Sequence, residues 1–571
     1  MRANRGASQI LFGMLPSQTV DLEGGVWRVS RWVDPVPISI DQATLRRTLL
    51  QAVKPWADHG DDSGISTLLY AQEEVQLVRV NELRGVSVER FPKQWRCRQC
   101  NRLTTASDRR CTCGSTRFAQ MQFVAYHKCG RLQEPQLRRC RTHGQVAVRL
   151  PGTAAARELY FYCPECNREL SRGFPYKPCD CGTNERMDLN VHRSGVVFSP
   201  HYTVLVNPPD PTEAARLIST GGGARALDWV LNGLSGEDPS AGQQTVQGLE
   251  EMLIQNGLTP EFAKQMAQNA LERGEVAEGS DGGRVDLPHD VRELAQEEAI
   301  DLMTALDRGR LRVQGMIDGS GPPLKALYES SYPPKIKRAG LANVELLTDF
   351  PVTTLAFGFT RDGRDPAETT LVPFRDRERG TIRVYGLQAH TEALLFQLDP
   401  VQVLGHLRER GFSLPNAPDA KSARVELLKT VRIPHPSENE PQGLGEAVIT
   451  LLHSYAHRLI RHLAFNSGIE RDELSEYLLP HHLSLIVYAS SRGDFVLGGL
   501  QSVFETALHL SLESFVAGET RCPLDPGCRA GGGACMACLH LGEPSCRWFN
   551  RFLDREVLFG ENGFVSNAHH E

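Results

Sequence analysis

Five cysteines lie within twenty-five residues in the stretch Cys522-PLDPG-Cys528-RAGGGA-Cys535-MA-Cys538-LHLGEPS-Cys546. Two thiolates separated by two residues can bind one metal ion from a tight turn. Two further cysteines complete the tetrahedral set of four sulfur ligands that is typical of a structural zinc site. We expect Cys528, Cys535, Cys538 and Cys546 to be that set, because they lie nearest to the Cys535–Cys538 pair, and Cys522 to be spare. The stretch predicts a fold held together by metal, with any chemistry located elsewhere.

The size and composition of the chain are those of a water-soluble protein with several domains. It has 571 residues and no apolar run near the roughly 20 residues that a membrane-spanning helix requires. The N-terminal residues MRANRGASQILFGMLP are too weakly apolar for a secretory signal. Its fifteen cysteines fall largely in tight pairs, which favours metal binding in a reducing compartment over disulfides. We therefore expect a cytoplasmic location and no membrane partner.

Two segments of the N-terminal half share one pattern, CxxC-N-R followed by CxC-G. In a zinc ribbon, each half is a short hairpin whose turn presents two thiolates, and a glycine after the second pair relieves the turn sterically. The repeat predicts two four-cysteine zinc sites. Their expected ligands are Cys97, Cys100, Cys111 and Cys113 in the first copy, and Cys163, Cys166, Cys179 and Cys181 in the second.

A weaker candidate site lies between the two copies. His127, Cys129, Cys140 and His143 together offer the four ligands of one more zinc ion, although no repeat supports this grouping. The alternative is that Cys129 and Cys140 are small buried hydrophobic side chains, as free cysteines often are. The sequence thus predicts three zinc ions, or four if this additional site exists.

The net charge of −6 hides a strongly basic block. Residues 93–149 contain 13 lysines or arginines against two acidic residues, a local net charge of +11. Such density is typical of a surface that binds a polyanion, so we expect contact with nucleic acid. The alternative is that these cations pair with the thiolate clusters or with the acidic segment 272–301. The residues we expect at a nucleic-acid surface are Arg109, Arg110, Lys128, Arg131, Arg138, Arg139 and Arg141.

Patterning along the chain predicts a multidomain α+β protein. Helical periodicity predominates after about residue 212, β-rich runs follow after about residue 344, and a Pro-rich linker opens the last part. We expect five segments: an N-terminal α/β segment (1–92), a basic double zinc-ribbon domain (93–210), a helical and acidic segment (211–335), a β-rich segment (336–434) and a C-terminal α/β zinc-binding domain (435–571).

The C-terminal domain is predicted to begin with an amphipathic helix over 446–465. His453 and His457 are four residues apart and share one face of that helix, a spacing that metal-binding helices use. No glutamate follows His453, as a zinc protease motif would require, so we expect packed or exposed histidines there.

Enzyme signatures are missing from the sequence. It contains no GK[ST] phosphate loop, no GxSxG, no HExxH and no zinc-deaminase motif. These absences favour a protein that is not an enzyme.

The C-terminal part of the chain contains the motifs LLHSYAHRLIRHLAFNSGI, YASSRGDFVLGGL, the CxxC pair and SCRWFNRFLDREVLFG. These motifs resemble the C-terminal domain that the DrmB family of DISARM phage-defence systems shares with MrfA-type DNA-repair helicases. The cysteine pairs and VHRSGVVFSPHYTVLVNPP resemble the N-terminal half of the family. The ribbons depart from the usual pattern by having CxC in place of CxxC. The resemblance implies a protein without its own motor, which binds a superfamily-two helicase (DrmA) and engages DNA as part of a hetero-oligomer.

Three functional hypotheses follow. The first is a non-catalytic accessory subunit that helps a helicase partner to capture phage DNA. The second is an enzyme with an unrecognised nuclease or hydrolase site in the β-rich segment. The third is a zinc scaffold whose basic block docks an acidic surface of the partner and does not touch DNA.

Overall fold

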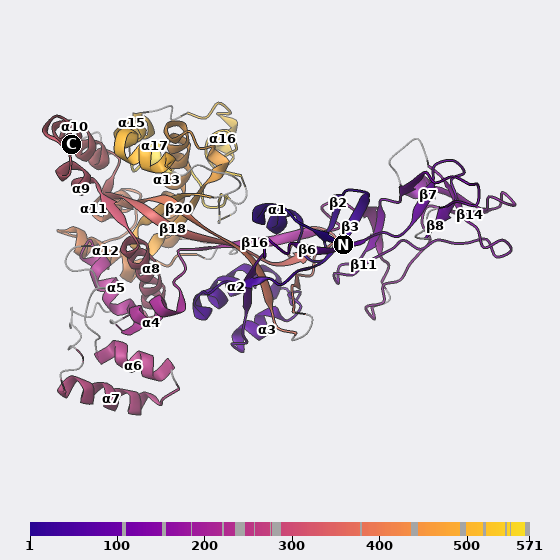
Figure 1. The fold of residues 1–571 in the computed structure, drawn as a ribbon. Coiled ribbons are helices and arrows are strands. Elements are labelled where there is room, and N and C mark those ends of the chain that lie inside the picture. Colours follow the sequence, from indigo (N-terminus) through magenta and orange to yellow (C-terminus); the bar gives the residue numbers. More distant parts are fainter. Residues whose placement is uncertain are drawn as a thin grey trace. The chain divides into compact units, whose positions relative to one another are not determined.

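A computed structural model shows a mixed α+β fold with several cysteine-rich clusters, which confirms the predicted fold class (Figure 1). The structure describes residues 1–105, 110–150, 156–183, 185–219, 222–234, 246–255, 257–273, 276, 287–376, 380–434, 443–490, 498–517, 521–542, 545–546, 548 and 550–565. Among these residues, no helix has both the length and the apolar character needed to cross a membrane.

The five segments expected from the sequence are grouped into two compact units. Unit 1 comprises Met1–Leu205 and Thr353–Gln388, and unit 2 comprises Val206–Val352 and Ala389–Glu571. Two long strands, β18 (Leu341–Thr360) and β20 (Arg383–Leu398), each contribute residues to both units. The expected β-rich segment is therefore divided between the units, because β18 and β20 are each long enough to serve two cores.

Unit 1 begins with a four-stranded antiparallel sheet of order β1-β6-β3-β2, whose core includes Ile10 and Leu11 of helix α1. Helices α2 and α3 cover a second core that includes β5 and the unit 1 parts of β18 and β20. Asp41 accepts a hydrogen bond from the Thr44 backbone N–H at 2.7 Å and so caps α2. The elements are β1 (Arg2–Ala3), α1 (Ala7–Gly13), β2 (Thr19–Leu22), β3 (Gly25–Trp32), β4 (Val36–Pro37), α2 (Gln42–Ala57), α3 (Ile65–Tyr70), β5 (Gln76–Arg79), β6 (Val86–Arg90), β16 (Ser199–Val206) and β19 (Val372–Pro373).

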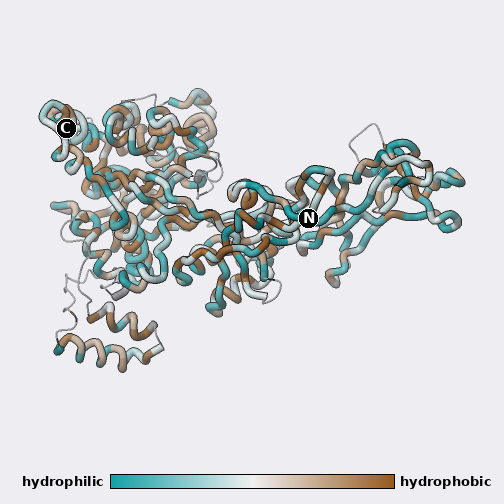
Figure 2. The backbone as a smooth tube through the Cα atoms, in the orientation of Figure 1, coloured by the Kyte–Doolittle hydropathy of each residue, from teal (hydrophilic) through white to brown (hydrophobic). Residues whose placement is uncertain are grey.

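The rest of unit 1 is built from three small sheets, with orders β8-β7-β9, β11-β10-β15 and β12-β13-β14. In Figure 2 this part of the chain carries more hydrophilic colour than unit 2, and its apolar clusters are small. Sheets of two- to four-residue strands bury little apolar surface, so they need another source of stability. The strands are β7 (Trp95–Cys97), β8 (Leu103–Thr104), β9 (Phe118–Gln120), β10 (Phe123–Tyr126), β11 (Leu132–Gln133), β12 (Ala147–Arg149), β13 (Tyr160–Tyr162), β14 (Glu169–Arg172) and β15 (Asp188–Val191).

Unit 2 contains the largest core, in which helix α13 (Leu444–Ser467) packs on the sheet formed with β21 (Leu474–Leu479) and β22 (Ser484–Ala489). The helix predicted over 446–465 is thereby confirmed, and it ends at Gly468, whose φ of +71° is the left-handed conformation that glycine adopts readily. Strand β22 pairs antiparallel with both β20 and β21. The C-terminal strands thus complete a sheet that begins in the β-rich segment.

The predicted helical middle is present as a run of helices, interrupted by the short strand β17 (Arg310–Arg312). Among the described residues, the other α-helices of unit 2 are α4 (Pro211–Ser219), α5 (Gly222–Leu231), α6 (Val246–Gln255), α7 (Pro260–Glu272), α8 (His289–Asp307), α9 (Val313–Asp318), α10 (Pro322–Arg338), α11 (Pro400–Glu409), α12 (Ala420–Thr430), α14 (Gly499–Ser502), α15 (Leu508–Ala517), α16 (Gly527–Ala530) and α17 (Glu556–Phe559).

Candidate metal centres

Five groups of four Cys, His or Glu side chains converge among the described residues, with the ligand atoms of each group within 4.8 Å of one another. Four groups are rich in sulfur and suit zinc. We call them the first ribbon cluster (Cys97, Cys100, Cys111, Cys113), the second ribbon cluster (His127, Cys129, Cys179, Cys181), the third ribbon cluster (Cys140, His143, Cys163, Cys166) and the C-terminal cysteine cluster (Cys522, Cys528, Cys535, Cys538). The fifth, the buried mixed cluster, comprises His453, His457, Glu476 and Cys546.

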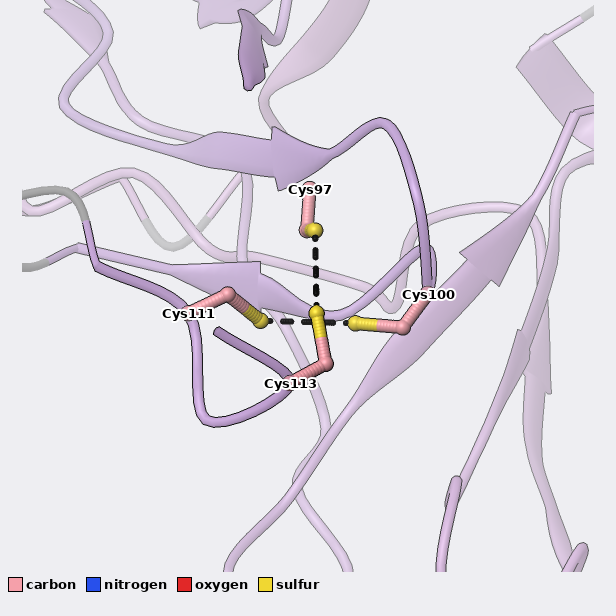
Figure 3. Close-up of side chains that lie close together, drawn as sticks. All are labelled: Cys97, Cys100, Cys111 and Cys113. Atoms are coloured by element: carbon pink, nitrogen blue, oxygen red, sulfur yellow. Dashed lines mark hydrogen bonds between the residues drawn. The ribbon is translucent and has the colours of Figure 1, made fainter. Parts of the chain in front are cut away.

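The first ribbon cluster gathers the four cysteines that the sequence grouped together (Figure 3). The Sγ atoms of Cys97 and Cys113 lie 3.7 Å apart, and those of Cys100 and Cys111 lie 3.3 Å apart. A tetrahedral zinc ion with Zn–S bonds of about 2.3 Å would separate its sulfur ligands by about 3.8 Å. The observed spacing therefore suits one zinc ion at the centre.

Local backbone geometry prepares the Cys97–Cys100 turn for a metal ion. Burial raises the pKa of the Cys97 thiol, but hydrogen bonds from the backbone N–H groups of Cys100 and Gln99 outweigh burial and bring the pKa to about 6. Asn101 closes the turn with a φ of +61°, a conformation that asparagine tolerates better than most residues. A lowered pKa favours the thiolate, which is the form that binds zinc.

The second predicted ribbon site is not formed, because its two cysteine pairs belong to different clusters. Cys163 and Cys166 join Cys140 and His143, whereas Cys179 and Cys181 join His127 and Cys129. The weaker site expected from His127, Cys129, Cys140 and His143 is divided in the same way. These eight residues thus form two clusters, each of three cysteines and one histidine. In the sequence, all four residues of the third ribbon cluster lie between Cys129 and Cys179 of the second.

Strand pairing explains this exchange of partners. Ala147 of β12 pairs with Tyr162 of β13, so the turn that precedes β12 lies beside the turn that begins at Cys163. Tyr126 of β10 pairs with Asp188 of β15, so the residues after β10 lie beside those that precede β15. Antiparallel neighbours bring their flanking turns together, and each cluster is built from two such turns.

The third ribbon cluster is centred on His143. Its Nδ1 atom lies 3.5 Å from the sulfurs of both Cys140 and Cys163. The Cys163–Cys166 turn is followed by Asn167 at a φ of +56°, as Asn101 follows the first ribbon turn. The repeat in the sequence therefore marks two equivalent CxxC turns. The first is completed by two cysteines, Cys111 and Cys113, and the second by a cysteine and a histidine, Cys140 and His143.

The second ribbon cluster has a hydrogen-bonded outer partner. His127 Nδ1 lies 3.8 Å from Cys181 Sγ, and His127 Nε2 lies 3.0 Å from a carboxylate oxygen of Glu185. Metal-binding histidines commonly donate their second ring N–H to a carboxylate, which fixes the tautomer and orients the ring. His127 is therefore arranged to present Nδ1 to a metal ion.

The C-terminal cysteine cluster corrects the expected ligand set, since Cys522 takes the place predicted for Cys546. The Sγ atoms of Cys522 and Cys535 lie 3.5 Å apart, and those of Cys528 and Cys538 lie 3.7 Å apart. Asp525 accepts a hydrogen bond from the Cys522 backbone N–H at 3.0 Å and also binds Arg555, which turns the chain back toward the cluster. Nearness in the sequence to the Cys535–Cys538 pair therefore did not identify the fourth ligand.

Cys546 lies in the buried mixed cluster instead, because strand β21 holds its neighbour. The Glu476 backbone N–H donates to the Ser545 carbonyl at 3.2 Å, and the Ser545 hydroxyl donates to the Asp472 carbonyl at 3.0 Å. The expectation that His453 and His457 are merely packed or exposed is incomplete, since both are buried in this cluster. Their four-residue spacing was the available signal, but Glu476 and Cys546 lie too far along the chain to be recognised as partners.

The predicted nucleic-acid residues differ in their surroundings. Arg109 lies outside the described residues, and Arg110 is exposed. Lys128 pairs with Glu185 at 3.2 Å, and Arg131 pairs with Asp180 at 3.1 Å. Arg138, Arg139 and Arg141 are all exposed beside Cys140 of the third ribbon cluster.

Two aromatic side chains lie on the small sheet β12-β13-β14, which is adjacent in the chain to the third ribbon cluster. The rings of Tyr160 and Tyr162 on β13 are stacked with centroids 5.9 Å apart, and the Arg149 guanidinium lies 4.8 Å from the Tyr162 ring centroid. Both tyrosines are half-buried, whereas Phe161 between them is buried in the core. Alternation along the strand thus directs the two tyrosines away from the core that Phe161 occupies.

Comparisons with known proteins match parts of this chain. Residues 6–195, which include all three ribbon clusters, match a family model described as a domain of unknown function, DUF8724. The chain is also similar to the DISARM protein DrmB of Bacillus paralicheniformis, with 29% identity over 126 residues. That stretch covers 20% of this chain and 22% of the relative, so the similarity is distant and spans less than a quarter of either protein.

Proposed function

We propose that this chain is a zinc-bearing, non-catalytic subunit of a DISARM-type antiphage complex, in which it binds DNA beside a superfamily-two helicase resembling DrmA. The distant similarity to DrmB supports the defence role. The single observation that carries the DNA contact is the combination of exposed arginines and stacked tyrosines around the third ribbon cluster.

Zinc would stabilise the parts of unit 1 whose apolar core is small. Four sulfur-rich clusters offer four complete ligand sets, each with Cys or Cys and His as the donors that zinc prefers. Because the sites form only in the folded chain, metal binding would contribute directly to folding free energy. The proposed metal content of these four clusters is therefore four zinc ions, and the three in the ribbon clusters serve as structural supports for the basic surface.

Arg138, Arg139 and Arg141 are the basic residues best placed to contact phosphate groups. They are exposed within four residues of chain, at a turn that the third ribbon cluster would hold rigid. The part of the chain that the structure describes contains no carboxylate paired with any of the three. Lys128 and Arg131 already have acidic partners, so they contribute less to the attraction of a polyanion.

The stacked tyrosines add a way to bind unpaired bases. Aromatic side chains in single-strand binding proteins stack on successive bases with little sequence preference, and arginine adds cation–π contacts. Tyr162 immediately precedes the ligand Cys163, so the platform would share the support of the third ribbon cluster. A helicase exposes single strands, which gives a DNA-binding partner of this kind a substrate.

A non-catalytic role agrees with the missing phosphate loop, since the sequence has no Gly-Lys-Ser or Gly-Lys-Thr. ATP hydrolysis needs a phosphate cradle and a carboxylate that holds magnesium. The helicase partner would supply both. We expect the purified chain alone to hydrolyse no ATP and to cut no DNA.

The test compares DNA binding and ATPase activity for the chain alone, the helicase alone and the co-expressed pair. Replacing Arg138, Arg139 and Arg141 with alanine should reduce the salt dependence of DNA binding by about one unit of log–log slope per lost phosphate contact. A triple Ala variant of Arg5, Arg31 and Arg79, which are also exposed, makes the same change in net charge and should leave the slope unaltered.

Two outcomes would redirect the proposal. If the Arg138/Arg139/Arg141 variant loses the helicase while DNA binding by the isolated chain is unchanged, the basic surface is a protein-docking surface. Metal-dependent cleavage of DNA by the pure chain, abolished by one carboxylate substitution within 340–430, would instead favour an enzyme.

A further inference from the structure

The buried mixed cluster joins three segments of unit 2 that are far apart in the sequence. His453 and His457 lie one turn apart on α13, Glu476 lies on β21, and Cys546 follows the serine that pairs with β21. Both histidines and the glutamate have 0% exposure, and the cysteine has 5%. Four polar side chains are therefore enclosed together in the largest core of the protein.

The ligand atoms of these four residues converge on one point. His453 Nε2 lies 3.2 Å from Cys546 Sγ and 3.0 Å from Glu476 Oε1, and His457 Nε2 lies 3.3 Å from the same carboxylate oxygen. Ligands of a tetrahedral ion with bonds of about 2.0–2.3 Å are separated by about 3.3–3.8 Å. The observed distances are close to that range.

Hydrogen bonding within the protein does not account for this arrangement. Among the described residues, no hydrogen bond is formed by the buried atoms Glu476 Oε1, Glu476 Oε2 and His457 Nε2, although both imidazole Nε2 atoms lie within 3.3 Å of Oε1. Burying polar atoms without partners is costly, and native structures avoid it unless an ion or water supplies the partner. A cation at the point of convergence would give Glu476 Oε1 and His457 Nε2 a partner at once.

A nucleophilic triad is excluded by the geometry. In a Cys-His-carboxylate triad, one imidazole nitrogen faces the nucleophile and the other faces the carboxylate. Here Cys546 and Glu476 both lie beside Nε2 of His453, while its Nδ1 has no hydrogen-bond partner in the part of the chain that the structure describes. The complete burial of the cluster would also deny a substrate access to the sulfur.

Outer contacts orient the ligands as they do in metal proteins. His457 Nδ1 lies 2.9 Å from the Leu539 carbonyl oxygen, so it donates its proton there and leaves Nε2 free to coordinate. The Asn550 backbone N–H donates to Cys546 Sγ at 3.2 Å, which stabilises a thiolate.

We propose that His453, His457, Glu476 and Cys546 bind a fifth metal ion, zinc, in a closed structural site. The mixture of two imidazoles, one carboxylate and one thiolate contains each donor type that zinc accepts. The site fastens α13 to β21 and to the turn at Ser545. It also touches the C-terminal cysteine cluster, because Leu539 directly follows Cys538 in the chain.

The experiment measures metal in the intact chain by native mass spectrometry, together with X-ray anomalous scattering at the zinc edge. We expect five zinc ions per chain and an anomalous peak among His453, His457, Glu476 and Cys546. The Glu476→Gln and His457→Ala variants should each retain four ions. His462→Ala, on the same helix but hydrogen-bonded to Ser514, is the matched control and should retain five.

Measurements on the unaltered chain keep the proposal open to refutation even if the variants do not fold. Four ions in the unaltered chain with no anomalous peak inside the mixed cluster would overturn it. A peak at the iron edge and none at the zinc edge would overturn the assignment of zinc. Neither result depends on DNA binding or on a helicase, so failure here is separable from failure of the proposed function.

Discussion

The Nδ1 atom of His457 lies 2.9 Å from the carbonyl oxygen of Leu539, which joins helix α13 to the residue after the ligand Cys538. Arg461, one turn further along the helix, donates to the carbonyls of Met536 and Ala537 at 3.0 and 3.1 Å. One face of α13 thus binds the backbone of the C-terminal cysteine cluster through polar contacts. The two candidate metal centres of unit 2 are consequently parts of one connected structure.

Cys522→Ser should remove one zinc ion and leave a chain that is insoluble or rapidly proteolysed. It leaves three ligands in the C-terminal cysteine cluster, and a structural zinc site contributes on the order of 10 kcal/mol of apparent folding free energy. Elemental analysis and limited proteolysis measure both effects. A soluble variant with an unchanged zinc content would instead favour the set predicted from the sequence, in which Cys546 is the fourth ligand.

The exchanged partners of the ribbon clusters can be tested by pairs of substitutions. Cys129→Ser with Cys179→Ser affects one cluster and should remove one zinc ion, whereas Cys163→Ser with Cys179→Ser affects two and should remove two. Zinc counting by native mass spectrometry distinguishes them. Loss of a single ion from the second pair would mean that Cys163 and Cys179 share a site, as the sequence repeat suggested.

Glu185→Gln should lower the zinc affinity of the second ribbon cluster by about 10- to 100-fold, because it removes the carboxylate that orients His127. Competition with a chelator measures the affinity. Glu165→Gln is the control, since Glu165 pairs with Arg102 and lies in the Cys163–Cys166 turn of the third ribbon cluster. Equal losses from both variants would indicate a general loss of stability.

Tyr160→Ala with Tyr162→Ala should weaken binding to single-stranded DNA by about 1–3 kcal/mol for each base that loses its stacking partner. Binding to duplex DNA should change less, because its bases are already stacked. Fluorescence anisotropy with both substrates measures the difference, and Tyr70→Ala, which alters a tyrosine that is 74% exposed, serves as the control. Equal weakening of binding to single-stranded and duplex DNA would contradict a role for the two tyrosines in base stacking.

The contribution of His481 to the stability of unit 2 should fall as the pH rises from about 6.5, because protonated His481 is held by Glu298. Burial lowers the pKa of His481, but the carboxylate 2.6 Å from its Nδ1 outweighs burial and raises the pKa above the ordinary value of 6.5. A histidine whose pKa is higher in the folded than in the unfolded state stabilises the fold fully at a pH below the unfolded-state pKa. This contribution to the free energy of unfolding is lost as the pH rises through the folded-state pKa. Urea unfolding of the unaltered chain and of His481→Gln between pH 6 and 8.5 measures this. If the free energies of unfolding of the two chains changed in parallel with pH, His481 would make no such contribution.

Local patterns in the sequence were sufficient to predict the individual metal-binding turns and the main helix. The CxxC-N turns at Cys97 and Cys163 depend on a few adjacent residues, and asparagine adopts the left-handed conformation at both. The apolar spacing of α13 likewise depends only on neighbours along the helix. Such features need no knowledge of distant contacts.

The sequence by itself determined the candidate ligands of the three ribbon clusters, because donor type and turn geometry are local properties. Only the tertiary structure decided which turns share an ion, since the pairing of β12 with β13 and of β10 with β15 selects the partners. In the same way, Cys546 meets His453 rather than Cys538 because its neighbour Ser545 pairs with β21. Strand pairing joins residues irrespective of their separation along the chain, so spacing could not reveal these assignments.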